Sequence, residues 1–90
     1  MPETTAMVTV SFHYWAGARA AAGVERESVE AATVAEAIAI VGGQRSDPRF
    51  ARILNASSVL LHNRVLHGDD LSRPLAGPVE VEVLPPFAGG

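Results

Sequence analysis

The stretch that decides the fold is VTVSFHYW, residues 8–15, in which apolar and polar side chains alternate. A period of two is typical of a strand with one buried face. A second alternating run, VEVEVL at residues 79–84, follows a Gly77-Pro78 turn. These are the most regular strands that the sequence predicts. The inward positions would be Val8, Val10, Phe12 and Tyr14 in the first, and Val79, Val81 and Val83 in the last.

Working outward from the first strand, residues 16–23 predict a turn with a single helical turn. Gly23 can take the positive φ that starts a return. Residues 24–30 contain three glutamates, which suit an exposed edge strand. The spacing of Thr33 and Glu36 matches a capping box, so a helix is predicted over residues 33–41. Gly42 or Gly43 would end it in the left-handed conformation.

The second half of the chain predicts a shorter helix and more strands. Asp47 and Pro48 are a good N-cap and first-turn pair. Residues 57–63 read as a strand, with a turn at Asn63 and Arg64 into a brief strand at residues 65–66. Together the order predicts an α+β fold, the β-grasp arrangement of ubiquitin-like domains. It would have a mixed sheet, one main helix, and the last strand beside the first.

Ninety residues suffice for one modest core, so we expect a β-grasp domain at residues 1–84 and an extended tail at 85–90. The net charge of −3, with seven arginines and no lysine, argues against nucleic acid. No secretory signal or membrane span is visible, which predicts a soluble cytoplasmic protein. The absence of cysteine excludes disulfides and thiolate sites.

Two apolar residues have the parity of the polar face. Trp15 continues the positions of Thr9, Ser11 and His13, and Leu84 continues those of two glutamates. One interpretation is that the alternation simply fails here, as it often does at strand ends. The other is that Trp15 and Leu84 lie together on adjacent strands as a partner-binding surface, where tryptophan is often a hot spot. His13 is expected to be a surface residue.

The chain ends in LPPFAGG, residues 84–90, directly after the last predicted strand. Pro85 and Pro86 favour an extended conformation, and about 3.3–3.6 Å per residue gives a reach of about 20 Å. Phe87 could fill an apolar pocket, followed by Ala88, while Gly89 and Gly90 could pass a narrow constriction. The Gly90 carboxylate could then be activated as an acyl adenylate. A loose terminus without function is the alternative.

The chain resembles the MoaD/ThiS sulfur carriers. The resemblance rests on this tail, on FHYWAGARAAAG at residues 12–23, on the helix from Thr33 and on the HN turn. Within this family it is most similar to the small subunit of molybdopterin synthase. The resemblance implies a carrier, not an enzyme on its own. Gly90 would be adenylated with ATP by a ubiquitin-activating-like adenylyltransferase and converted to a thiocarboxylate. ATP would be consumed there, and no cofactor would be held permanently.

The resemblance also implies partners and contact residues. A MoaE-type large catalytic subunit would receive the tail and convert cyclic pyranopterin monophosphate to molybdopterin, while a cysteine desulfurase or rhodanese would donate the sulfur. Trp15, Leu66 and Leu84 correspond to interface residues, and Arg19 to a charged contact. Two departures are the Gly77-Pro78 turn and Phe87, where the family more often has glycine-aspartate and valine.

Other functions remain open at this point. A carrier for thiazole, cysteine or tungsten-pterin synthesis would have the same chemistry, whereas a ubiquitin-like modifier would join Gly90 to lysines of target proteins. A docking domain would not need the diglycine. The polar residues of the 62–70 segment, which are His62, His67, Asp69 and Asp70, match no standard metal site, so no metal is predicted.

Overall fold

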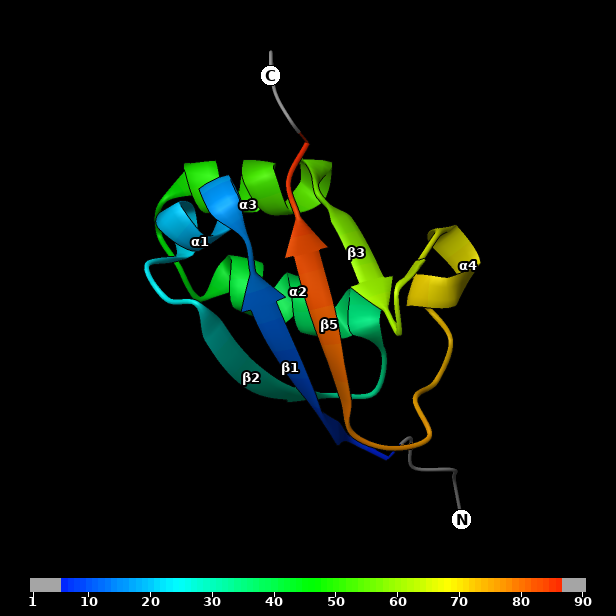
Figure 1. Ribbon diagram of the computed structural model, residues 1–90. Helices are drawn as coiled ribbons and strands as arrows, with labels where there is room; N and C mark the ends of the chain where they lie inside the picture. The colour runs from blue at the N-terminus through cyan, green and yellow to red at the C-terminus, as the bar shows by residue number, and fades with distance from the viewer. Residues whose placement is uncertain (1–5, 87–90) are drawn as a thin grey trace.

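The last strand lies beside the first at the centre of a five-stranded sheet (Figure 1). In the computed structural model, which describes residues 6–86, the strand order is β2-β1-β5-β3-β4. β1 and β5 are parallel, and the other neighbours are antiparallel. The strands are β1 Val8–Tyr14, β2 Arg26–Ala31, β3 Ser58–Leu61, β4 Arg64–Val65 and β5 Val79–Leu84.

Three helices cover one face of this sheet and leave the other open (Figure 1). They are α1 Ala16–Ala22, α2 Val34–Gly43 and α3 Pro48–Ala56; a fourth, α4 Gly68–Leu71, lies beside β3. A β-hairpin, a helix packed beneath it and a final strand inserted next to β1 define the β-grasp fold. The predicted α+β class and mixed sheet are confirmed. The helical layer, however, includes α3, which is only one residue shorter than α2.

The alternation predicted for the two central strands sets the core. Val10, Phe12 and Tyr14 of β1 and Val81 and Val83 of β5 are fully buried. The ring of Tyr14 packs at 5.8 Å from that of Phe12 and meets Phe50 of α3 edge-on at 5.5 Å. Offset and edge-to-face aromatic pairs add to the stabilisation from burial. The helices contribute Ala18, Val34, Ala37, Val41, Phe50 and Leu54 to the same core.

Both predicted helix starts are confirmed by their caps. The Thr33 hydroxyl accepts a hydrogen bond from the Glu36 amide at 3.0 Å, and the Glu36 carboxylate accepts one from the Ala32 amide at 2.7 Å. Asp47 accepts from the Arg49 amide at 2.9 Å. These contacts satisfy amides that have no partner inside the helix.

Two predictions around the glycines need correction. α1 has seven residues rather than one turn, although Gly23 ends it with φ +82° as expected. α2 continues through Gly42 and Gly43 to a right-handed cap at Gln44, so the predicted left-handed glycine cap is wrong. The Gln44 amide bonds to the Ile40 carbonyl at 3.1 Å and completes the last turn without a positive φ.

The segment after β3 also differs in detail. The turn consists of His62 and Asn63, with φ of 53° and 65°, and therefore precedes the predicted turn by one residue. Two successive positive φ values suit a tight hairpin. The following segment forms α4, and the Asp70 carboxylate accepts a hydrogen bond from the His67 amide at 3.1 Å.

A polar network closes one edge of the core. Glu27 of β2 accepts a hydrogen bond from the Tyr14 hydroxyl and forms an ion pair with Arg45 at 2.8 Å. The Arg45 guanidinium lies 4.4 Å from the Phe50 ring centroid and donates to the Ala22 and Val41 carbonyls. Burial raises the pKa of the Tyr14 phenol, and the hydrogen bond to Glu27 and its charge raise it further.

Tyr14, the sole tyrosine, therefore provides a test of this packing. We expect no phenolate absorbance at 295 nm from the folded protein at pH 11, well above the ordinary pKa of 10.0. The folded state holds the Tyr14 proton more tightly than the unfolded state does. The stabilisation that comes from this difference is complete below pH 10 and declines as the pH rises above it. Urea unfolding at pH 11 should release the signal. A phenolate that titrates near pH 10 in the folded protein would contradict the buried network.

Candidate functional site

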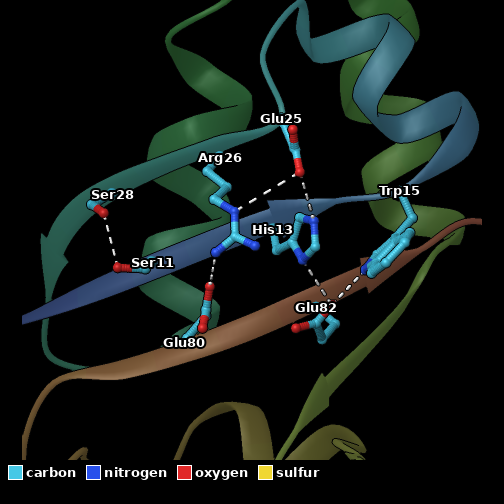
Figure 2. Close-up of polar contacts among 8 residues, drawn as sticks. All are labelled: Ser11, His13, Trp15, Glu25, Arg26, Ser28, Glu80 and Glu82. Carbon is cyan, nitrogen blue, oxygen red and sulfur yellow. Dashed lines mark hydrogen bonds and ion pairs between the residues drawn. The ribbon is translucent and has the colours of Figure 1, made fainter.

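The open face of the sheet carries a ladder of polar pairs across β2, β1 and β5 (Figure 2). The Ser11 and Ser28 hydroxyls are 2.9 Å apart, and Arg26 forms an ion pair with Glu80 at 2.8 Å. Ser11 and Ser28 are Cα partners on neighbouring strands, whereas Arg26 of β2 reaches across β1 to Glu80 of β5. The polar half of this face therefore follows directly from the alternation of β1 and β5.

His13 is an exception on this face because it is buried, with 8% exposure. Its Nδ1 lies 3.1 Å from Oε1 of Glu82, and its Nε2 lies 3.3 Å from Oε2 of Glu25. Figure 2 shows the ring held between the two carboxylates, one from β5 and one from the segment between α1 and β2. Parity placed His13 on the correct face, but the expectation of an exposed residue is wrong.

Trp15 covers the other side of this histidine. The two ring centroids are 4.4 Å apart, and the indole Nε1 donates a hydrogen bond to Glu82 Oε1. The Trp15 amide donates to the Val83 carbonyl at 3.1 Å, which continues the β1–β5 pairing by one residue. Trp15 therefore follows the register of β1 and β5 alongside Leu84 on the open face, in agreement with one of the two interpretations of the sequence. Its side chain remains accessible, since the residue is 44% exposed.

Apolar side chains continue from Trp15 across β5, β3 and β4. Leu84 is 38% exposed and pairs with Ser58, while Leu60 pairs with Glu82 on one side and Val65 on the other. Paired residues share a face, so Leu60 and Val65 lie on the same open face as Leu84, with Ser58 and Glu82 as their polar neighbours. We call this the apolar patch, defined by Trp15, Leu60, Val65 and Leu84. The sequence analysis did not identify Leu60 and Val65 as part of this surface. The alternation with the buried Val59 would have placed Leu60 on the open face.

The structure does not bring all four predicted contact residues together. Leu66 is 8% exposed and belongs to the core, where its amide bonds to the Val59 carbonyl. It cannot offer its side chain to a partner as the predicted interface residue would. Arg19 is exposed on α1, one helical turn after Trp15, and lines a hollow that also includes Glu25. It therefore lies next to the patch rather than within it.

The first residues of the tail follow directly after the patch residue at the end of β5. Pro85 and Pro86 follow Leu84 and line one wall of an apolar groove of ≈ 330 Å³ between α1 and α3. Ile53 lies in this groove, and Arg52 is its charged residue. The predicted insertion residues Phe87 and Ala88 and the reactive Gly89 and Gly90 lie outside the described residues. Their roles stay predictions.

Within residues 6–86, no group of three or more metal-ligating side chains could hold an ion. Of the polar residues in the 62–70 segment, His67 and Asp70 cap α4 instead. Among the helices of residues 6–86, none has the length and apolar character needed to span a membrane. The pKa of the Asp70 carboxyl is lowered, first by the His67 amide and then by nearby arginines.

No protein-family model and no curated protein sequence matches the chain. The chain does match several solved structures. Small archaeal modifier protein 1 from Methanosarcina acetivorans superposes with a TM-score of 0.76 at 19% identity, over 93% of this chain and 98% of that one. What the two share is the fold. At this identity the likeness establishes the β-grasp architecture and leaves the function to other observations.

Two further matches are subunits of molybdopterin-converting factors. The putative subunit 1 from Pyrococcus furiosus gives a TM-score of 0.65 at 20% identity, covering 89% of this chain and 99% of that one. A chain from the complex of subunits 1 and 2 from Helicobacter pylori gives 0.65 at 16% identity, covering 92% and 100%. The structural neighbours thus include both modifier proteins and the group that the tail motif resembles.

Proposed function

We propose that this chain is the sulfur-carrier subunit of a molybdopterin synthase. It would carry sulfur as a thiocarboxylate on Gly90 for the conversion of cyclic pyranopterin monophosphate to molybdopterin. The observation that carries the proposal is the position of the tail: LPPFAGG begins at the residue of β5 that forms part of the apolar patch. A partner seated on the patch would have Gly90 within about 20 Å of its own surface.

The chemistry would take place on the terminal carboxylate. An activating enzyme would transfer AMP from ATP to a Gly90 oxygen, with release of pyrophosphate. A sulfur nucleophile at the oxidation level of sulfide would then attack the acyl carbon. The new C–S bond forms while the C–O bond to the adenylate breaks, and AMP leaves with the electron pair. The chain itself would supply the acyl group and the docking surface, but no catalytic residue.

The partners follow from this division of labour. An adenylyltransferase of the ubiquitin-activating type and a large synthase subunit would each have to engage the patch and receive the tail. The sulfur would come from the persulfide of a desulfurase or rhodanese, and a thiol reductant would supply the two electrons that bring it to the level of sulfide. The Helicobacter pylori neighbour was solved as a complex of subunits 1 and 2, which supports an arrangement of this kind. A cytoplasmic location is part of the proposal, since these reactions use ATP.

Protein modification is the second candidate, because small archaeal modifier protein 1 shares the fold. A modifier would form isopeptide bonds from Gly90 to lysines of target proteins. The chain has no lysine of its own, so it could not build chains on itself. Expression with an N-terminal epitope tag separates the two. A ladder of larger tagged species that disappears on deletion of Gly90 would favour modification, whereas a single unconjugated species favours the carrier.

The apolar patch makes a prediction for association with the large subunit. Trp15→Ala should weaken the complex by about 30-fold, because an exposed tryptophan at an interface is often worth about 2 kcal/mol or more. Leu84→Ala should weaken it less. Isothermal titration calorimetry would measure both affinities, and urea unfolding of the isolated chain would measure stability.

Met7→Ala is the matched control, since Met7 is also exposed and apolar but lies before the opposite end of β1. It should leave the affinity unchanged. If Trp15→Ala and Met7→Ala have the same affinity, the patch is not the docking surface. If Trp15→Ala loses stability to the same extent as affinity, Trp15 acts as part of the fold.

A further inference from the structure

The contacts of His13 are unusual for a neutral imidazole. Both ring nitrogens face carboxylate oxygens, of Glu82 at 3.1 Å and of Glu25 at 3.3 Å. A neutral ring has one N–H and one lone pair, so one nitrogen would then direct its lone pair at a carboxylate. Only the doubly protonated ring presents an N–H to both. The geometry around His13 is therefore the one that an imidazolium prefers.

Most of the charged groups around the ring are carboxylates. They are Glu25 just before β2, Arg26 at the start of β2, and Glu80 and Glu82 of β5 (Figure 2). Arg26 pairs with Glu80 at 2.8 Å and is 4.0 Å from Glu25, and Arg19 lines a hollow together with Glu25. A protonated His13 would place a further cation directly between Glu25 and Glu82. The indole of Trp15, 4.4 Å from the imidazole, adds an aromatic neighbour that also interacts well with a cation.

Glu82 connects this ring to the apolar patch. Its Oε1 is the atom that contacts His13 Nδ1, and it also accepts the hydrogen bond from Trp15 Nε1. A change in the position or charge of the His13 ring therefore affects Glu82, the carboxylate that holds the indole of Trp15 in place. When the ring is neutral, Glu82 loses an ion-pair partner and is freer to turn away, which releases Trp15 from its orientation.

We propose that His13 is a positioning residue whose imidazolium form, held between Glu25 and Glu82, fixes Trp15 at the edge of the apolar patch. The presentation of Trp15 then depends on the charge of the His13 ring, and histidine is a side chain whose charge responds to pH. The inference for partner docking rests on the proposed function. The effect on Trp15 does not, because it belongs to the isolated chain.

Trp15 is the only tryptophan, so its fluorescence reports this contact without a label. An imidazolium in contact with an indole quenches its emission. We expect a sigmoidal loss of Trp15 emission in the full chain as the pH falls from 8 to 5. His13→Gln should abolish this transition, whereas His62→Gln and His67→Gln should preserve it, since neither residue contacts the indole. Circular dichroism would establish that each variant is folded.

Two-dimensional nitrogen NMR of the unaltered protein gives a measurement that does not depend on a variant. Over the same transition, both ring nitrogens of His13 should show the chemical shifts of an imidazolium, coincident with the fluorescence change. Emission that is independent of pH, or that retains its transition in folded His13→Gln, would overturn the proposal. So would a His13 ring that remains a neutral tautomer while the emission changes.

The link to docking has its own readout. The affinity of the wild-type chain for the large subunit should fall as the pH rises through the fluorescence transition, and that slope should be lost in His13→Gln. A chain that shows the fluorescence transition but binds no large subunit would contradict the proposed function and leave the role of His13 intact. Binding with the same pH slope in both proteins would overturn the coupling of His13 to docking.

Discussion

Deletion of Gly90 is expected to abolish sulfur transfer, with a loss of at least about 100-fold, while the unfolding temperature stays the same. The deletion moves the terminal carboxylate back by one residue, about 3.3–3.6 Å along an extended chain. A displacement of about 1 Å from the reactive geometry can already cost about 100-fold in rate. The core that the structure describes within residues 6–86 is formed by the central strands and the helices, and we expect it to be unaffected by the deletion.

The measurement is dithiolene formation in a reconstituted reaction with ATP, an activating enzyme, a sulfur source and the large subunit. Gly90→Ala is the matched control, because it keeps the length of the tail and the position of the carboxylate and adds one methyl group. It should retain more activity than the deletion. A deleted chain that transfers sulfur as well as the wild type would exclude the carrier mechanism.

Arg45→Ala is expected to lower the free energy of unfolding by about 2–4 kcal/mol, more than the removal of an exposed ion pair. Arg45 and Glu27 are each about one-fifth exposed, with side-chain values of 18% and 21%, so their ion pair is screened only in part. Removal of the guanidinium leaves the Glu27 carboxylate without its cation. It also removes hydrogen bonds to two carbonyl groups and the contact with the Phe50 ring.

Urea unfolding at neutral pH would measure this loss. Arg49→Ala is the matched control: its side chain is 74% exposed and pairs with Asp47, so the change in stability should be much smaller. Glu27→Gln should lie between the two, because an amide can still accept the Tyr14 hydrogen bond without the charge. If Arg45→Ala is no more destabilising than Arg49→Ala, the network is a surface feature without a structural role.

The sequence predicted the sheet well because its central strands alternate strictly. The inward valines of β5 and the aromatics of β1 specify a buried face, and parity alone placed Trp15 and Leu84 on the opposite one. Local capping signals at Thr33 and Asp47 identified where two helices begin. These features depend on spacings of a few residues, which a sequence displays directly.

Features that depend on distant residues were not predictable in the same way. Parity says which face His13 occupies, but its burial comes from Glu82, 69 positions later in the chain, and from Trp15 folding over it. Leu66 follows a strand of only two residues, so its inward direction depends on the hairpin register and on its hydrogen bond to Val59 of β3. Gly42 and Gly43 resembled a helix end, yet the tertiary packing of α2 carried the helix through both.

The most direct test of the carrier proposal is the intact mass of the protein after incubation with ATP, a candidate activating enzyme and a sulfur source. We expect a gain equal to the replacement of one oxygen by sulfur, and fragmentation should locate it on Gly90. An unchanged mass under conditions in which the enzyme adenylates a known carrier would contradict the account. So would the appearance of Gly90 solely in isopeptide bonds to other proteins.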